Sequence, residues 1–176
     1  MDIIPNSLIL RCQSVFSEII AHFANLSFSE SRFPDKFKQA SGTPLLKGRS
    51  LDKTVPSNYR PIFNLNFISK VLEPLFLTRF QPHILDSPNF NSYQSPYIPG
   101  CSTESSLQLF LDRIYSTSDK KRLMLLVSLD LSAAFDMVEH AILLKRLSCS
   151  FGVSGVAYSW IRFYLDGRTQ FVRMGS

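Results

Sequence analysis

The sequence predicts an α+β fold in which amphipathic helices alternate with short strands. Apolar residues recur every three or four positions in several windows of ten or more residues, which is the period of a helix with one buried face. Between these windows lie short apolar runs flanked by turn residues, which are typical of strands. Because the two patterns interleave along the chain, a mixed architecture of helices and sheet is favoured.

The composition bounds the class of protein. The chain has 176 residues, a length that fits one domain, or one and a piece of another. Because 45% of its residues are hydrophobic and only 19% are charged, its composition excludes a disordered protein. No apolar stretch reaches the roughly 20 residues of a membrane-spanning helix, and the N-terminus lacks the pattern of a signal peptide. Three widely spaced cysteines form neither a disulfide framework nor a metal-binding motif, which favours a reducing, intracellular compartment.

The charge balance gives a mild indication of a polyanionic partner. Lysine and arginine number 19 against 14 acidic residues, a net charge of +5. Basic residues gather over positions 36–60 and again at 120–122. An ordinary basic protein is the simpler alternative on charge alone.

The N-terminal third predicts one helix and one strand. Asn6 can cap a helix whose apolar positions continue at helical spacing to Phe23, and Pro34 with its polar neighbours ends this unit. A short basic segment then leads to a plausible strand over 40–46. The polar stretch 47–59 contains glycine and proline and is a predicted loop.

The middle of the chain predicts two helices and a buried strand. Residues 61–67 form a short apolar run between turns, and 69–80 has a helical pattern that Pro74 is expected to kink or stop early. After an irregular stretch over 82–100, a second clear helix begins at Ser102 or Thr103. Residues 123–129 form an almost unbroken apolar run, whose length favours a strand buried on both faces.

The C-terminal part returns to helix and ends in a strand. Residues 138–147 have a helical pattern, and Ser154 can cap a further helix. Asp166 and Gly167 indicate a turn, and 169–174 is the last predicted strand.

The sharpest local feature is a pair of carboxylates after the apolar run. The predicted strand delivers Asp130 at its C-terminal end, small residues follow, and Phe135 precedes a second carboxylate at Asp136. Mg²⁺ and Mn²⁺ take one or two carboxylates together with substrate phosphates, so this pattern can hold a divalent metal. The alternative is that both aspartates only cap a turn or a helix N-terminus, which is the favoured explanation for Asp136.

Other catalytic patterns are absent from the sequence. The three histidines, at positions 22, 83 and 140, have no partner at metal-ligand spacing. No glycine-rich phosphate loop, dinucleotide-binding motif or nucleophile-elbow motif occurs.

Three motifs together resemble the reverse transcriptases of non-LTR, LINE-type retrotransposons, particularly the jockey-like branch. They are 58–62 (NYRPI), 68–73 (ISKVLE) and 125–136 (LLVSLDLSAAFD). Upstream, 33–40 and 44–48 match the family's entry into its fingers, and downstream, 140–147, 152–155 and 164–170 match its helix, turn and hairpin order. Each short motif is weak alone, but their number, order and spacing are specific.

The resemblance implies a fold and an activity. The fold would be the fingers and the first part of the palm of a right-hand polymerase, with the fingers over about 1–122 and the palm beginning at about 123–176. The activity would be RNA-templated DNA synthesis by two-metal nucleotidyl transfer with Mg²⁺ or Mn²⁺. The implied partners are an RNA template, a DNA primer and deoxynucleoside triphosphates, with no membrane, and the implied location is the nucleus or the cytoplasm.

The resemblance also implies roles for individual residues. Asp130 matches the first metal-binding aspartate of the palm, and Leu131 would add a backbone carbonyl to the metal site. Phe135 matches the bulky residue that excludes a 2′-hydroxyl, with a core aromatic as the alternative. Lys47 and Arg60 match basic residues of the fingers that hold the triphosphate.

Two arginines at the last predicted strand, one just before it and one within it, have an open role. Arg168 and Arg173 are candidates for contact with the nucleic-acid backbone, and a solvated face is an equal alternative.

Two departures from the family pattern bear on activity. In the stretch 94–104, Pro96 replaces a glycine and Ile98 replaces an arginine, so a template contact is expected to be damaged. The family's second metal motif has no counterpart, since the sequence contains no Asp-Asp pair. With that motif, a thumb and an endonuclease missing, the chain by itself is expected to be inactive. The alternatives are a non-catalytic RNA- or partner-binding remnant and a remnant that does not fold stably.

Overall fold

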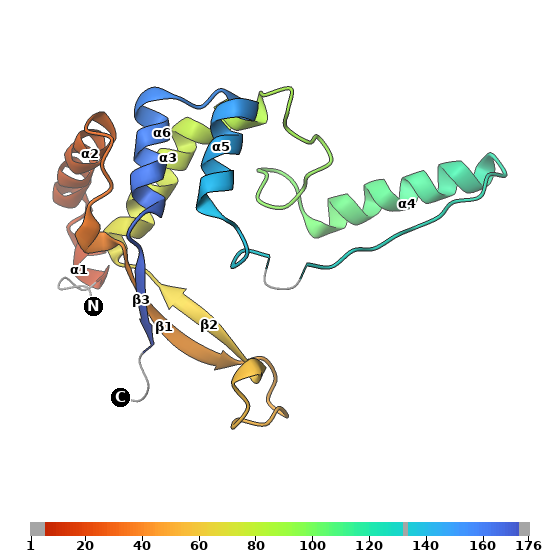
Figure 1. The fold of residues 1–176 in the computed structure, drawn as a ribbon, viewed down its shortest axis with the longest axis horizontal. Coiled ribbons are helices and arrows are strands. Elements are labelled where there is room, and N and C mark those ends of the chain that lie inside the picture. Colours follow the sequence, from red (N-terminus) through yellow and green to blue (C-terminus); the bar gives the residue numbers. More distant parts are fainter. Residues whose placement is uncertain (1–5, 132–133, 173–176) are drawn as a thin grey trace. The chain divides into compact units, whose positions relative to one another are not determined.

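The computed structural model describes residues 6–131 and 134–172, which mix helices and strands as the α+β prediction requires (Figure 1). The chain divides into two compact units. Unit 1 combines the segments Met1–Ser87 and Glu139–Ser176, and unit 2 is the segment Pro88–Val138 between them. This division by contacts does not test the predicted boundary between fingers and palm at about residue 122, which stays a prediction.

A three-stranded sheet lies in unit 1, and its central strand is β1 (Gln39–Leu46). On one side β1 pairs antiparallel with β2 (Tyr59–Asn64), and on the other side it pairs parallel with β3 (Thr169–Val172). The strand predicted over 40–46 is confirmed. The last predicted strand is confirmed as far as residue 172, and its remaining positions lie outside the described residues.

The β1–β2 hairpin tolerates a proline in the interior of each strand because of its register. Pro44 stands directly opposite Pro61. The bond from Lys47 N to Asn58 O, at 2.8 Å, continues the ladder beyond the strands, and in an antiparallel pair only every second residue pair exchanges hydrogen bonds. The pairs Lys47–Asn58 and Leu45–Arg60 are therefore hydrogen-bonded ones, and the proline pair, which is the next along, is not. The two missing N–H groups therefore take no bond from this ladder.

Two helices form the N-terminal part of unit 1, α1 (Asn6–Arg11) and α2 (Gln13–Ser29). The sequence predicted one continuous helix capped by Asn6, whereas Asn6 is itself helical and the helix is interrupted at Cys12. Cys12 has φ −108° and ψ 34°, outside the helical region. Its carbonyl accepts hydrogen bonds from both Val15 N and Phe16 N at 3.1 Å, so the second helix starts afresh there.

The long helix α3 (Phe67–Leu85) corrects the expectation of an early stop at Pro74. It runs through both Pro74 and Pro82. An interior proline costs about 3 kcal/mol because it removes one hydrogen bond and clashes with the preceding turn. The helix buries Ser69 and Leu72 completely on its core side, and this tertiary packing offsets the local cost.

Two C-terminal helices complete unit 1, α5 (His140–Phe151) and α6 (Gly155–Leu165). The prediction of both helices is confirmed. Gly152 ends α5 at φ 66°, a left-handed conformation that favours glycine. Ser154 occupies the N-cap of α6, although its side chain makes no capping hydrogen bond.

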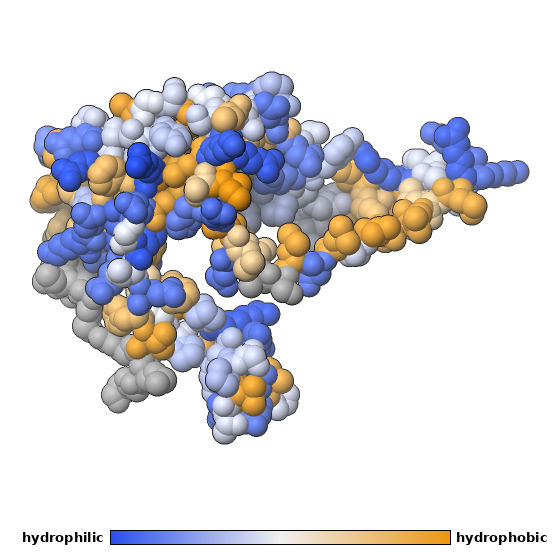
Figure 2. All heavy atoms as spheres, viewed as in Figure 1, coloured by the Kyte–Doolittle hydropathy of each residue, from blue (hydrophilic) through white to orange (hydrophobic). Residues whose placement is uncertain are grey.

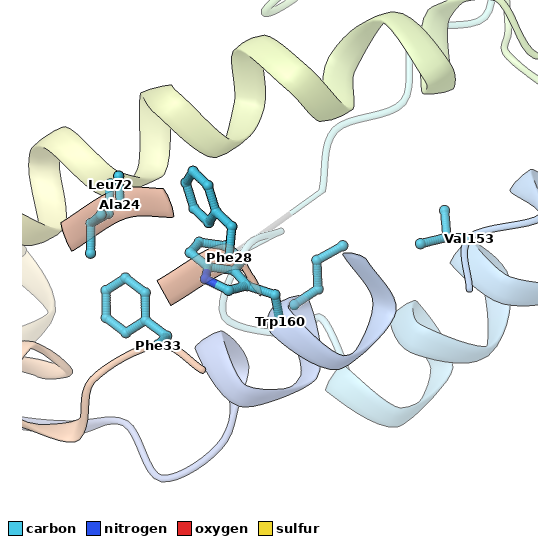
Figure 3. Packing of buried hydrophobic residues seen from close by; sticks show 7 residues of the cluster. Ala24, Phe28, Phe33, Leu72, Val153 and Trp160 are labelled. Carbon is cyan, nitrogen blue, oxygen red and sulfur yellow. The ribbon is translucent and has the colours of Figure 1, made fainter. Parts of the chain in front are cut away.

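The hydrophobic core of unit 1 is centred on Trp160 of α6 (Figure 3). Its ring stacks on Phe76 with centroids 4.1 Å apart and on Tyr164 at 5.5 Å, and it meets Phe28 and Phe33 edge-on at 5.5 Å each. The indole N–H donates to Ser27 Oγ at 3.0 Å, so its polar atom is satisfied. Burial of each large side chain in such a cluster is worth about 1.5–3 kcal/mol. The buried members are Ala24, Phe28, Phe33, Leu72, Val153, Trp160 and Ile161.

Unit 2 consists of an irregular segment, helix α4 (Thr103–Asp119) and an extended segment. The helix begins where the sequence predicted. Ser102 Oγ accepts a hydrogen bond from Ser105 N at 3.1 Å, and Ser105 Oγ accepts one from Ser102 N at 2.9 Å. This reciprocal capping box satisfies two of the N–H groups that a helix start leaves without partners.

The apolar run 123–129 is not the buried strand that the sequence predicted. Residues 123–131 form neither helix nor strand, and their side chains are exposed, from 44% at Met124 to fully exposed at Leu123. A strand requires a neighbour to accept and donate its backbone hydrogen bonds, and no strand of the described residues pairs with this segment. Figure 2 shows the resulting apolar surface in orange.

Within the described residues, no helix is both long enough and apolar enough to span a membrane.

Candidate functional site

The hairpin of unit 1 brings two of the predicted site residues together. Arg60 stands opposite Leu45, and Lys47 faces Asn58 just beyond the end of β1 and the start of β2. Because side chains alternate between faces, Lys47 and Arg60 lie on the same face of the hairpin as diagonal neighbours. Diagonal neighbours have Cα atoms roughly 7–8 Å apart, within reach of two long side chains that bind one ligand. Both residues are exposed.

Lys47 is anchored at the base of the loop that joins β1 to β2. Its ammonium donates to Ser57 O at 2.7 Å. An ammonium has three donors, so this contact orients the group and employs only one of them. A lysine cation held at the end of β1 and an arginine on the same face of the hairpin are a suitable pair for the oxygens of a polyphosphate.

The candidate metal residues lie in unit 2. Asp130 and Leu131 follow the apolar run in extended, irregular backbone, and both side chains are exposed, Leu131 at 77%. Within 6–131 and 134–172, no three His, Cys, Asp or Glu side chains group closely enough to hold a metal ion. Asp130 is thus one carboxylate with a neighbouring backbone carbonyl. This donor set alone does not fit the two-metal site that nucleotidyl transfer uses.

Phe135 is exposed at 77%, so a buried core position, the alternative considered for it, is excluded in this structure. Its ring meets Tyr97 edge-on, with centroids 6.3 Å apart. Tyr97 belongs to the stretch 94–104 that departs from the family pattern, and its φ of 63° is unusual for a residue with a side chain. The residue types alone do not indicate this contact, which joins positions that are far apart in the sequence.

Arg168 is half-buried within unit 1, so the solvated face, the alternative considered for it, does not describe its position. Its side chain is 24% exposed, Nε donates to Tyr164 O at 2.7 Å, and the guanidinium stacks over the Tyr164 ring at 3.8 Å. Nη2 lies 3.6 Å from Glu73 Oε1. Arg168 therefore fastens the start of β3 to α3 and α6. Its contact with nucleic acid stays a prediction, and Arg173 lies outside the described residues.

Glu73 and Tyr164 complete this cluster, and sequence reasoning missed both roles. The Tyr164 hydroxyl donates to Glu73 Oε1 at 2.7 Å. Burial of the phenol is the main cause, and its hydrogen bond to the Glu73 carboxylate the second, of a pKa of Tyr164 that lies well above its usual value. The cluster joins α3 to α6 and has no feature of a catalytic acid or base near neutral pH.

A family profile described as reverse transcriptase (RNA-dependent DNA polymerase) matches residues 47–175. The matched region begins at Lys47 and includes Arg60, Asp130, Leu131, Phe135 and Arg168.

Three curated relatives are similar over most of the chain. The retrovirus-related Pol polyprotein from the type-1 retrotransposable element R1 of Bradysia coprophila is 32% identical over 148 residues, 82% of this chain and 14% of the relative. The protein named probable RNA-directed DNA polymerase from transposon BS of Drosophila melanogaster is 27% identical over 81% of this chain and 15% of its own length. A 115 kDa protein in the element R1DM of the same fly is 30% identical over 78% and 13%. The chain thus spans only about one seventh of these relatives.

Proposed function

Because the chain belongs to the reverse transcriptase (RNA-dependent DNA polymerase) family as a domain of a non-LTR retrotransposon, we propose that it takes part in RNA-templated DNA synthesis. In this proposal unit 1 supplies the fingers hairpin that binds the incoming deoxynucleoside triphosphate. The segment that contains Asp130 supplies the start of the palm. The nucleic acids involved are an RNA template and a DNA primer.

One observation carries the proposal, namely the placement of Lys47 and Arg60 on one face of the β1–β2 hairpin. The profile match begins at the first of these residues. A lysine supplies a compact charge and an arginine a bidentate fork, so the pair is suited to the adjacent phosphates of one nucleotide.

Asp130 is proposed as one carboxylate of a divalent metal site, with the Leu131 carbonyl beside it. Proteins of this family generally use divalent metal ions, and Mg²⁺ or Mn²⁺ would neutralise charge on the nucleotide phosphates when bound. Among the described residues, Asp130 belongs to no group of three or more side chains that could hold a metal ion, so only Asp130 and the Leu131 carbonyl are assigned to this site. Phe135 is proposed to restrict the sugar of the incoming nucleotide.

Nucleotide binding by the purified chain tests the carrying observation. We expect wild-type protein to bind a deoxynucleoside triphosphate by isothermal titration calorimetry, and Lys47→Gln and Arg60→Gln each to weaken binding by about tenfold, the loss of one charge-assisted contact. Lys145→Gln, which removes an exposed lysine of α5, is the matched control and should bind normally. Equal binding by all four proteins would contradict the proposed site.

Primer extension tests the role of Asp130. The chain by itself is expected to extend no primer with Mg²⁺ or Mn²⁺, because one carboxylate does not make a two-metal site. Template-dependent incorporation that persists in Asp130→Asn would exclude Asp130 as a metal ligand for this reaction.

An RNA-binding role without catalysis is the second candidate, and the exposed basic loop between β1 and β2 favours it. RNA binding should then be unaffected by Asp130→Ala. A combined change of Lys47 and Arg60 to glutamine should weaken binding and reduce its dependence on salt. Unchanged RNA binding in both variants would remove the support for this role.

A further inference from the structure

The loop over 47–58 is closed by hydrogen bonds at both its base and its middle. At the base, Lys47 N donates to Asn58 O at 2.8 Å. In the middle, the side-chain amide of Asn58 donates from Nδ2 to Asp52 O at 2.9 Å, and Asn58 N donates to Val55 O at 3.0 Å. Asn58 therefore holds three parts of the loop at once.

Asp52 shapes the far side of the same loop. Its Oδ1 accepts hydrogen bonds from both the backbone N and the hydroxyl of Thr54, each at 2.8 Å. The bond from the Thr54 backbone and, to a smaller extent, the bond from its hydroxyl lower the pKa of the Asp52 carboxyl. The Tyr59 hydroxyl donates to Lys53 O at 3.0 Å, which ties the loop to β2. All these bonds lie within the loop and the two residues that flank it.

The charge of the loop would favour an open conformation without these contacts. Lys47, Arg49, Lys53 and Arg60 are all exposed and stand against the single carboxylate of Asp52. Repulsion among four cations spreads a flexible loop, whereas a polyanion binds best to cations that are already close together. The Asp52 carboxylate fixes the local turn at Thr54, and the Asn58 side chain joins the backbone of that turn to the end of the loop. Together these bonds act against the repulsion and in favour of a bound polyphosphate.

We propose that Asp52 and Asn58 are positioning residues for a triphosphate, which they serve by holding the loop closed so that Lys47 and Arg60 stay side by side. This inference rests on the proposed nucleotide-binding function and deepens it. Neither residue needs to touch the ligand. The ligand class is a polyphosphate with at least two adjacent anionic groups, which a deoxynucleoside triphosphate supplies.

Two aspartate variants provide the sharpest test because they remove the same charge. Asp52→Asn keeps an oxygen that accepts from Thr54, and Asp52→Ala removes it. With inorganic tripolyphosphate as the probe and the whole chain in calorimetry, we expect Asp52→Asn to bind at least as tightly as wild type. Asp52→Ala should bind roughly three- to tenfold more weakly than Asp52→Asn, because a looser loop has to be ordered when the ligand binds, which costs free energy. Equal affinities of the two variants would overturn the proposal.

The salt dependence separates positioning from direct contact. Asn58→Ala removes no charge, so its affinity should fall by a similar factor with the wild-type slope of log Kd against log salt concentration. Lys47→Gln and Arg60→Gln should both weaken binding and flatten that slope, because each removes a cation that meets the anion. A flattened slope in Asn58→Ala would contradict a purely positioning role.

The outcomes for the inference and for the proposed function are distinct. If wild-type protein binds no tripolyphosphate, the nucleotide site and the positioning role both fail. If Lys47→Gln weakens binding while Asn58→Ala and Asp52→Ala do not, the nucleotide site stands and the positioning role is overturned. Circular dichroism shows whether each variant is folded. If Asp52→Ala or Asp52→Asn is unfolded, the comparison of Asn58→Ala with wild type decides the positioning role.

Discussion

Unit 1 and unit 2 have similar apolar patterns in their sequences but differ in what they bury. All the buried side chains of the described residues lie in unit 1, while in unit 2 the most protected side chains are only partly covered. Helix α4 has apolar residues at Leu107, Phe110, Leu111 and Ile114, as regularly spaced as those of α2. An amphipathic pattern therefore predicts a helix but not its burial, which needs a second apolar face within the same unit.

The largest expected effect is in the core of unit 1. Phe33→Ala should lower the free energy of unfolding by about 3–5 kcal/mol, because it empties a site 1% exposed and packed edge-on against Trp160 and Tyr164. Trp160 is the only tryptophan, so its fluorescence during urea unfolding reports on this unit. Tyr115→Ala, at a 63% exposed position of unit 2, is the control. Similar transitions for the two variants would show that the units do not differ as their burial indicates.

A smaller effect is expected from the hydroxyl of Tyr164. Tyr164→Phe should cost about 1.5–3 kcal/mol, because the lost hydrogen bond ends on a carboxylate, that of Glu73. The same fluorescence-detected unfolding at pH 7 measures it. A variant as stable as wild type would mean that the hydroxyl contributes nothing to the packing of α3 against α6.

The difference in unfolding free energy between wild type and Tyr164→Phe should shrink at alkaline pH. Its folded-state pKa is raised, first by burial and then by the bond to Glu73, so the stability it contributes is fully present below the unfolded pKa of about 10. Above that pH the unfolded chain ionises first, and this stability is lost as pH rises. The wild-type and Tyr164→Phe unfolding free energies should thus converge between pH 10 and 11.5. A constant difference over this range would contradict the raised pKa.

In unit 2 a local effect of about 1 kcal/mol is expected at the start of α4. Ser102→Ala removes the acceptor of one capping bond and weakens the reciprocal one. Amide hydrogen exchange over the first turn of α4 should accelerate, while the unfolding transition of unit 1 should not shift. Ser116→Ala, an exposed serine inside the same helix, is the control and should not accelerate exchange.

The smallest effect on stability is expected in the apolar segment 123–131. Combined replacement of Leu125 and Leu129 by serine, at positions 88% and 87% exposed, should change the free energy of unfolding by less than about 0.5 kcal/mol. It should nevertheless reduce self-association, measured by light scattering over a concentration series, because it interrupts a contiguous exposed apolar run. A large loss of stability would show that these leucines are packed in solution.

The sequence alone determined the features that depend on neighbouring residues. The start of α4 at Ser102 and Thr103 and the turn at Gly167 follow from residue types within one helical turn or one β-turn. The family motifs are equally local, which is why Lys47, Arg60 and Asp130 could be named as candidates before their surroundings were known.

The tertiary structure decided what depends on distant partners. Helix α3 continues through Pro74 because its core face is buried, and the apolar run 123–129 is not a strand because the described residues offer it no neighbour. The inward position of Arg168 depends in part on Glu73 of α3, which is far from it in the sequence, as well as on the nearby Tyr164. Helical hydrogen bonds join residues four apart, whereas strand pairing, burial and ion pairing join residues that only the folded chain brings together.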